Sequence, residues 1–542
     1  MSLYSWDALA KPGPICMTVL QSEPPAALRS TVSRPVAAIW PWVLVLLIVV
    51  SGVVLRVTLA SSRPLWSDEL FSWSNSAQWS YRNLLRLKSS ETFHPTLSFI
   101  LIKISMDLFR SNAPLVVRST SLIAGLACIP FAFQLGRAVA GPKFGWVLAA
   151  LSALDPLAVD QSAQARMFTL ALAPALFALA KAIDSLQAIA RGGKDTTRYG
   201  AVQVGLALAI GLWANVLVVT PWGAIVMAGC IIAAAPTAFG VAPPQVSNVR
   251  RAIWRFLWQL SAIGLIVLIP VVFKLVIRGW RHVEQDATLS LSAVEPALLH
   301  HLSRLISVGQ TGPLPSALVW LFVLGGVLAV FRRNRVAGLV LLLSLLMGLF
   351  IAVPVGMVRS GSIGVRYFVL ALPAMWAGLA GWMLLPGTRG RVIMTTISLG
   401  LFVLQAFHSM AMVYKWKNDY EFRVLPAVTA TRPLISPADQ VLYFGIPAPE
   451  IVRYSGIKAD DASKATAAEK PKVTWLMILR IKPKEEAPAL AIIHRLGAEY
   501  GVATANIDVM AKRPENGLIL RFSESRVDLL HFGADPRTGP VY

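Results

Sequence analysis

The strongest constraint on this chain is a succession of long apolar runs separated by short, basic loops. The first run, Val36–Ala60, is long enough to cross a bilayer, which takes about 20 residues of α-helix. Of all residues, 56% are hydrophobic and 14% are charged, whereas soluble domains are about 45–50% apolar and about 25% charged. The runs are continuous instead of alternating residue by residue, which disfavours a β-barrel. The sequence therefore predicts an α-helical integral membrane protein.

The lengths of the runs predict about eleven membrane-spanning helices. A shorter run, Pro95–Phe109, is interrupted by charges and is expected to lie in the membrane interface. With that assignment the basic loops all fall on one side, as the positive-inside rule requires. If Pro95–Phe109 crossed the membrane, every later loop would change sides and this agreement would be lost. After the first run, the predicted spans are Leu115–Leu135, Phe144–Val159, Met167–Leu186, Tyr199–Val219, Trp222–Phe239, Phe256–Ile277, Pro315–Phe331, Val336–Met357, Tyr367–Leu385 and Val392–Val413.

The apolar pattern divides the chain into three parts. Residues 1–35 are expected to form a disordered cytoplasmic tail. Residues 36–413 form the membrane domain, and their first outer loop is 61–114. Residues 414–542 mix short apolar runs, such as Val441–Phe444 and Val473–Leu479, with a helical stretch, Ala489–Tyr500, and so predict a small α/β domain on the outer side. The net charge of +22 is spread over separate loops, which argues against a nucleic-acid partner.

Two adjacent acids, Asp68 and Glu69, lie just after the first run. Acids at the edge of a membrane are costly to bury and often functional. A carboxylate here could act as a general base or help to hold a divalent metal. The alternative is a solvated acidic turn that caps a helix. His94 stands just before the interfacial helix and could contact a phosphate, ligate a metal, or serve the structure alone.

Three arginines lie at outer ends of predicted spans, against the general bias of positive charge to the inside. Arg118 begins a span, Arg166 closes a short loop, and Arg366 precedes the start of another span. A guanidinium matches phosphate oxygens in bidentate geometry, so a lipid phosphate would explain them. Snorkelling towards headgroups is the alternative, and it is the role expected for Arg56.

Together these features resemble the GT-C membrane glycosyltransferases. The most similar group is that of the protein O-mannosyltransferases and lipid A aminoarabinose transferases, including bacterial dolichyl-phosphate-mannose–protein-mannosyltransferase-like proteins. The resemblance covers roughly residues 36–413. Two departures are His94-Pro95-Thr96 in place of His-Pro-Pro, and Phe168 in place of a tyrosine after Arg-Met. Besides the acidic pair, the motifs on which the resemblance rests are Leu-Gly-Arg-Ala-Val-Ala-Gly141, Ala-Leu-Asp-Pro156, Gln161-Ser-Ala-Gln-Ala-Arg-Met-Phe168 and Arg366-Tyr-Phe-Val-Leu-Ala-Leu-Pro373.

The resemblance implies a GT-C fold: an all-α, multi-pass protein of the cell (inner) membrane with interfacial helices. The small C-terminal periplasmic α/β domain predicted above for residues 414–542 follows this membrane domain. It implies transfer of one sugar from a polyprenyl-phosphate donor to a glycan, lipid or protein acceptor at the periplasmic face, by an inverting mechanism. Asp68 would be the base and Glu69 its support. The resemblance implies no certain cofactor, and a divalent metal held by Asp68, Glu69 and His94 stays an alternative. The residues assigned to the donor phosphate or sugar are His94, Arg118, Asp160, Arg166, Arg366 and Tyr367.

Three other functions stay open. A transporter or flippase of lipid-linked saccharides would have a similar number of spans, but such proteins usually show repeated halves, and no repeat is recognisable here. An oligosaccharide ligase would transfer a whole glycan from a pyrophosphate carrier. A receptor-like module would leave the acidic pair unexplained.

Overall fold

The computed structural model describes twelve stretches of the chain: 40–85, 96–192, 197–286, 313–360, 365–416, 428, 430–444, 454–462, 473–478, 486–502, 518–523 and 526–532. The chain divides into two compact units, Met1–Leu44 and Val45–Tyr542. The predicted tail at 1–35 lies outside the described residues.

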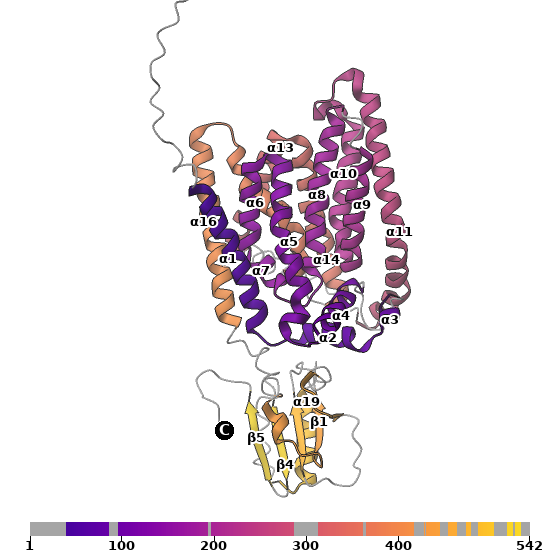
Figure 1. Ribbon diagram of the computed structural model, residues 1–542, viewed down its shortest axis with the longest axis vertical. Coiled ribbons are helices and arrows are strands. Elements are labelled where there is room, and N and C mark those ends of the chain that lie inside the picture. Colours follow the sequence, from indigo (N-terminus) through magenta and orange to yellow (C-terminus); the bar gives the residue numbers. More distant parts are fainter. Residues whose placement is uncertain are drawn as a thin grey trace, which may run out of the picture. The chain divides into compact units, whose positions relative to one another are not determined.

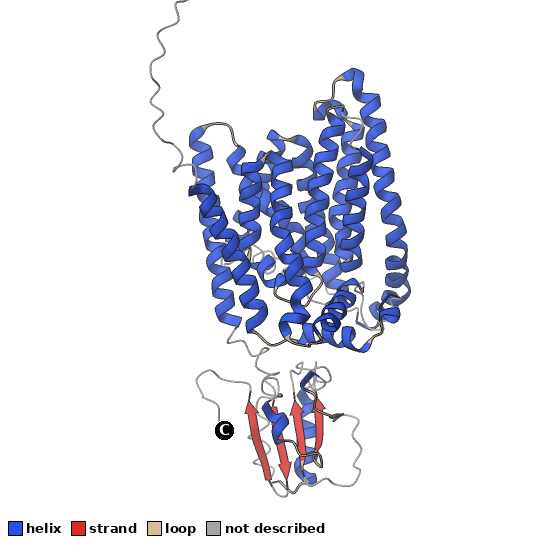
Figure 2. Ribbon diagram, in the orientation of Figure 1, coloured by secondary structure: helices blue, strands red, loops and turns tan. Residues whose placement is uncertain are grey.

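Most of the described chain is helical, and the long helices run roughly parallel to one another (Figures 1 and 2). Among them α8 is the most central, because most of its residues are buried and it packs against α5 and α9. The helices are α1 (Trp40–Ser62), α2 (Ser67–Gln78), α3 (Tyr81–Leu85), α4 (Leu97–Phe109), α5 (Pro114–Ala140), α6 (Pro142–Leu154), α7 (Pro156–Ser162), α8 (Phe168–Ala190), α9 (Thr197–Ala214), α10 (Val219–Ala234), α11 (Val246–Asp286), α13 (Pro313–Arg333), α14 (Arg335–Ser360), α15 (Leu372–Gly381), α16 (Thr388–Trp416) and α19 (Glu486–Glu499).

Short 3₁₀ helices join or extend several of these elements. The one that concerns the site is η5 (Val365–Ala371), which runs directly into α15. The others are η1 (Val216–Val218), η2 (Pro236–Phe239), η3 (Pro243–Gln245), η6 (Trp382–Leu384) and η8 (Arg432–Leu434).

Among the described residues, five helical segments are long and apolar enough to cross a membrane. The predicted all-α membrane fold is therefore confirmed, while the number of about eleven spans stays a prediction. Helix α4 coincides with the predicted run Pro95–Phe109, and its position in the membrane interface also stays a prediction. The five segments are Val43–Ser62, Pro114–Ala140, Phe168–Ala190, Val216–Ala234 and Arg366–Leu384.

The predicted span Phe144–Val159 is wrong as a single helix. It is divided into α6 and α7 at Asp155, whose side chain accepts a hydrogen bond from the Ala158 amide at 2.8 Å and so caps α7. Pro156 occupies the first helical position, where its missing N–H costs nothing. Helix α7 packs closely on α5 because Gly125 has no side chain, since a Cβ there would collide with Ser162 Oγ.

The strands all lie in the C-terminal part of the described chain (Figure 2). They form one sheet in the order β2-β1-β3-β4-β5, with β1 parallel to β2 and β3, and with β4 antiparallel to β3 and β5. Side chains of Leu476 and Phe522 on one face of the sheet share a buried cluster with Ile493 and Leu496 of α19. The predicted α/β character is confirmed, and the boundary at residue 414 stays a prediction. The strands are β1 (Gln440–Phe444), β2 (Asp460–Asp461), β3 (Thr474–Ile478), β4 (Leu518–Ser523) and β5 (Arg526–Phe532).

Candidate active site

The acidic pair lies in the first turn of α2, where the helix dipole favours negative charge. Glu69 Oε2 accepts a hydrogen bond from the backbone N–H of Trp66 at 3.2 Å, so Glu69 caps the helix on which it stands. The capping part of that alternative therefore holds for Glu69, but its side chain is fully buried and not solvated. Asp68, one residue earlier on the helix, points elsewhere and has different partners.

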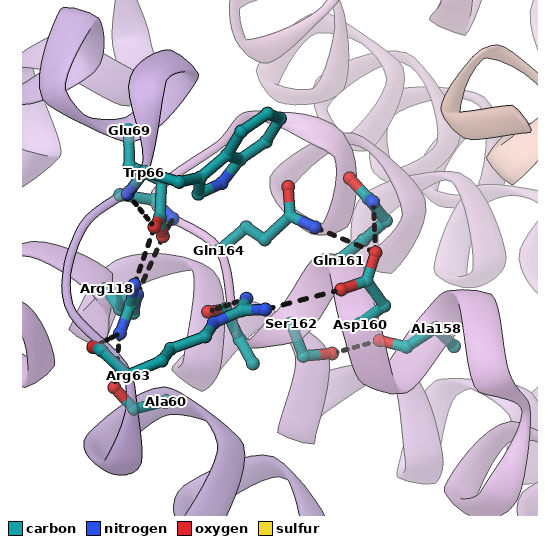
Figure 3. A network of polar contacts seen from close by, with 12 residues as sticks. Ala60, Arg63, Trp66, Glu69, Arg118, Ala158, Asp160, Gln161, Ser162 and Gln164 are labelled. Atoms are coloured by element: carbon teal, nitrogen blue, oxygen red, sulfur yellow. Dashed lines mark hydrogen bonds and ion pairs between the residues drawn. The ribbon is translucent and has the colours of Figure 1, made fainter. Parts of the chain in front are cut away.

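Glu69 and Arg118 form a fully buried ion pair (Figure 3). Arg118 Nε and Nη2 donate to the two carboxylate oxygens of Glu69 at 2.7 and 2.6 Å. The other N–H groups of Arg118 donate to the carbonyls of Ala60, Arg63 and Pro64 at 2.7–2.8 Å. A guanidinium has five N–H donors, and all five are used. Arg118 therefore has no N–H group left for a phosphate. Internal hydrogen bonds take the place of its predicted contact with the phosphate of the sugar donor.

The Glu69–Arg118 pair joins segments that are distant in sequence. Through Arg118 it holds the end of α1 and the loop before α2. Through Glu69 Oε1 it also holds the backbone N–H of Ala165, at 2.7 Å, in the loop between α7 and α8. Burial alone would raise the pKa of Glu69, but the charge and hydrogen bonds of Arg118, with help from Arg63 and Ala165, hold that pKa below its usual value. Glu69 is therefore an ionised anchor that sets the positions of its neighbours Asp68 and Arg166.

Asp68 lies between two arginines. Its Oδ2 pairs with Arg366 Nη1 and lies 3.5 Å from Arg166 Nη2, while Arg166 Nη1 donates to the Asp68 carbonyl at 3.1 Å. The side chains of Asp68 and Arg366 are 30% and 31% exposed, whereas that of Glu69 is 0% exposed. Asp68 and Arg366 thus form the accessible part of the site. A carboxylate with two guanidiniums beside it can accept a proton and hold an anion at the same place.

Arg366 is placed by η5, which continues directly into α15. Its guanidinium carbon lies 5.8 Å from the ring centre of Tyr367, and the Tyr367 ring is buried. The Tyr367 ring packs edge-on against Phe168 with ring centres 6.3 Å apart. Phe168, one of the two departures from the glycosyltransferase pattern, therefore supports the Arg366–Tyr367 element through packing.

A second polar cluster surrounds Asp160 at the end of α7 (Figure 3). Asp160 Oδ2 accepts hydrogen bonds from Gln161 Nε2 at 2.9 Å and from Gln164 Nε2 at 2.7 Å. Arg63 Nη1 lies 3.8 Å from Asp160 Oδ1, and Arg63 Nη2 donates to the Ala163 carbonyl at 2.7 Å. Burial raises the pKa of Asp160 to about 6, against the opposing effect of Arg63 and the two amides.

The structure thus brings together most of the residues that the sequence singled out. Asp68, Arg166 and Arg366 are in direct contact, with Tyr367 beside Arg366. Asp160 is linked to the Glu69–Arg118 pair through Arg63, because Arg118 binds the Arg63 carbonyl.

Two arginines of the site region were missed or misjudged from the sequence. Arg63 was missed, although it too follows a predicted span at its predicted outer end, the signal that identified the other three arginines. The expectation that Arg56 snorkels is wrong. Arg56 is fully buried and donates to Ser162 Oγ at 3.2 Å and to the Ser152 carbonyl at 2.7 Å. A guanidinium that is paired inside the protein has no need to reach the headgroups.

The predicted metal alternative depends on His94, which lies outside the described residues. Within the residues that the structure does describe, no group of three or more His, Cys, Asp or Glu side chains could hold a metal ion. Asp68 and Glu69 point to different arginines, so these two carboxylates do not converge on one point. A metal site that includes His94 stays a prediction.

No family model and no curated protein matches the sequence. Solved structures do match. ArnT from Cupriavidus metallidurans in the apo state has a TM-score of 0.53 and 12% identity, over 84% of this chain and 95% of that chain. The same protein bound to undecaprenyl phosphate has a TM-score of 0.51 and 11% identity, over 83% and 94% of the two chains. An oligosaccharyltransferase from Archaeoglobus fulgidus has a TM-score of 0.47 and 14% identity, over 82% and 69%. The likeness to ArnT confirms the predicted GT-C fold.

Proposed function

We propose that this GT-C protein transfers a single sugar from a polyprenyl-phosphate donor to an acceptor hydroxyl by an inverting mechanism. The observation that carries the proposal is the accessible Asp68 carboxylate between Arg166 and Arg366. A protein with the same fold, ArnT, has been crystallised with undecaprenyl phosphate bound, which supports a polyprenyl-phosphate carrier here.

The chemistry follows from the charges of the site. The acceptor oxygen attacks the anomeric carbon while Asp68 takes the hydroxyl proton. The bond between the anomeric carbon and the phosphate oxygen breaks, and the electron pair leaves with the polyprenyl phosphate. A single displacement inverts the anomeric configuration. The leaving group is already an anion, so it needs cationic stabilisation and no protonation, and Arg366 and Arg166 supply that charge.

The pair between Asp68 and Arg366 has a direct consequence for the order of events. A carboxylate that is paired with a guanidinium is a weaker base, because the positive charge favours its ionised form. The donor phosphodiester carries one negative charge, gains a second as its bond to the sugar breaks, and accepts bidentate hydrogen bonds from arginine. Binding of the donor therefore draws Arg366 from Asp68 to the phosphate and leaves the carboxylate free to accept a proton.

Glu69 and Arg118 act as positioning residues in this proposal. Their fully bonded pair fixes the first turn of α2 and the loop before α8. Asp68 is next to Glu69 in the chain, and Arg166 is next to Ala165. The Glu69–Arg118 pair therefore sets the distance between the base, Asp68, and the phosphate ligand, Arg166. Groups held in this way lose little freedom when the substrate arrives, which favours reaction.

The reaction is proposed to occur at the periplasmic face of the inner membrane, with a glycan, lipid or protein as acceptor. Clustered basic residues at the opposite helix ends support this orientation. The resemblance to mannosyltransferases favours a hexose or pentose as the transferred unit.

The test is a transfer assay with purified protein and a panel of radiolabelled polyprenyl-phosphate sugars. Transfer predicts that one donor loses its label to an acceptor and releases polyprenyl phosphate in equal amount. A flippase would move the donor across a vesicle membrane without cleaving it. An oligosaccharide ligase would use only pyrophosphate-linked glycans. Either of these results would contradict the proposal.

A further inference from the structure

Helix α11 stands at the edge of the helical part (Figure 1). The side chains of this helix form two contrasting faces. One face is apolar and buried against α9 and α10 in the main hydrophobic core. Its members recur every three or four residues, as one side of a helix does. They are Val249, Ile253, Phe256, Leu257 and Leu260.

The opposite face carries two arginines and two tryptophans in alternation. Arg251, Trp254, Arg255 and Trp258 follow the spacing i, i+3, i+4 and i+7, so they form one continuous stripe along the helix. All four are exposed, and the exposed fractions of Trp254 and Trp258 are 52% and 74%. Exposed apolar patches that are bordered by polar residues mark sites of membrane or partner binding, so the stripe requires an explanation.

The stripe continues into apolar side chains further along the same helix. Leu265, Ile266 and Ile269 are exposed by 58%, 73% and 59%. At 1.5 Å per residue, Ile269 lies about 16 Å beyond Trp258 along the axis. That is about half of the roughly 30 Å thickness of the hydrocarbon core. The face is therefore long enough to span one leaflet. The predicted span Phe256–Ile277 would place the isoleucines towards the middle of the membrane, the tryptophans nearer its surface, and the arginines at the headgroups.

The charge of the stripe is not neutralised by the helix itself. From Val246 onward, the first acidic residue of α11 is Glu284, far beyond the stripe. Neither Arg251 nor Arg255 forms an ion pair with a described residue of the protein. Arg250 differs, because its Nε donates to the Ala233 carbonyl at 3.0 Å and so serves the end of α10. Two guanidiniums one turn apart therefore face outward without a counter-charge from the described part of the chain.

We propose that this face of α11 binds the headgroup of an anionic phospholipid. Arg251 and Arg255 contact the phosphate oxygens of the headgroup, since guanidinium matches phosphate oxygens in bidentate geometry. The indoles of Trp254 and Trp258 lie at the level of the ester bonds, where amphipathic rings are favoured. Leu265 and Ile269 contact the acyl chains. Two uncompensated positive charges favour an anionic headgroup over a zwitterionic one. This site is independent of Asp68 and of the proposed transfer reaction.

The test uses the full chain in nanodiscs of phosphatidylcholine with a minor fraction of phosphatidylglycerol. After extraction into detergent, native mass spectrometry counts the phosphatidylglycerol molecules that stay bound. The double variant Arg251→Gln/Arg255→Gln should bind phosphatidylglycerol more weakly by on the order of tenfold, because each arginine near an anionic surface contributes favourably. The matched control is Arg332→Gln/Arg333→Gln, which removes two exposed arginines from the last turn of α13.

The expected result is a loss in the α11 variant and no change in the α13 control. Equal losses in both would mean that only total charge matters and would overturn the proposal, as would full retention by the α11 variant. Trp254→Leu/Trp258→Leu provides a second measurement that keeps both charges. It should weaken retention of phosphatidylglycerol less than the arginine variant does, and an equal or larger loss would assign the site to apolar packing and contradict the headgroup contact. Thermal unfolding in pure phosphatidylcholine verifies that each variant is folded.

Discussion

The carboxylate of Asp68 and the guanidinium of Arg366 form an ion pair although 298 positions separate them in the sequence. One lies in the first turn of α2 and the other in η5, at the start of the segment that leads into α15. Both side chains are about one third exposed, so a ligand can reach each of them. The proposed mechanism depends on this pair, because it joins the group that takes a proton to the group that holds a phosphate.

Replacement of Arg366 should weaken use of the donor. Arg366→Ala removes a phosphate contact that is made before and during transfer, so both the donor affinity and kcat/KM should fall, the latter by roughly 10- to 100-fold. Donor titration of the purified variant measures both quantities. Arg82→Ala, an exposed arginine of α3, is the matched control and should behave like the natural protein. Unchanged affinity and turnover in Arg366→Ala would identify Arg366 as a headgroup anchor.

Replacement of Glu69 should act mainly on stability. Glu69→Gln leaves Arg118 buried with a neutral partner, and loss of one member of a buried pair costs about 3–5 kcal/mol. The variant should therefore unfold at a clearly lower temperature than Asp68→Asn, whose side chain is partly exposed. Thermal unfolding followed by size-exclusion chromatography compares the two. A Glu69→Gln variant as stable as the natural protein would contradict the anchoring role of the Glu69–Arg118 pair.

The stability of the protein should depend on Asp160 between about pH 4 and pH 6. Burial raises the pKa of Asp160 from 3.8 to about 6, so in this window the folded state binds more protons than the unfolded state. Stability contributed by the protonated carboxyl is therefore present at low pH and is lost as the pH rises through 6. Thermal unfolding across this range should show a smaller fall in stability with pH for Asp160→Asn than for the natural protein. Identical pH profiles would contradict a raised pKa.

Topology can be tested by labelling exposed cysteines from outside the cell. In a background without Cys16, Cys128 and Cys230, a cysteine in place of Gln78 or of Lys458 should react with an impermeant maleimide, because both positions are exposed and predicted to be periplasmic. Arg333→Cys should react only after the membrane is opened. Labelling of one of the first two positions without the other would contradict the predicted orientation.

The sequence predicted the helical membrane fold better than it predicted the roles of the site residues. Long apolar runs predicted the helical membrane fold, since a bilayer leaves few other ways to satisfy the backbone. The division of the span at Asp155 was missed because hydropathy does not register a capping residue, although the Asp-Pro pair carried the signal. Strand β5 (Arg526–Phe532) was not predicted either, because one short mixed run without its partners is ambiguous.

Within the site, the sequence identified residue types better than their roles. Arg118 and Arg366 gave the same signal, an arginine at the outer end of a span. The structure separates them, because Arg118 uses all five donors inside the protein whereas Arg366 is 31% exposed. Glu69 and Asp68 differ in the same way. Distant segments decide which of two neighbouring charges is buried. For Glu69 one such segment is the loop that contains Ala165, whose backbone N–H donates to the carboxylate, and no local sequence pattern contains that information.

The central claim is that Asp68 removes the acceptor proton, and Asp68→Asn tests it most directly. Asparagine keeps the shape of the side chain but cannot take a proton, so sugar transfer at saturating donor should fall by about 10²–10⁴-fold. The variant should still fold and bind the donor. Asp107→Asn is the matched control, since Asp107 of α4 accepts a hydrogen bond from the Tyr81 hydroxyl at 2.6 Å and has no part in the proposed reaction. Its replacement should leave transfer unchanged. A metal-binding role would instead make Asp68→Asn and Glu69→Gln equally severe, with partial rescue by added divalent ion. Full transfer activity of Asp68→Asn at saturating donor would contradict the claim that Asp68 is the base.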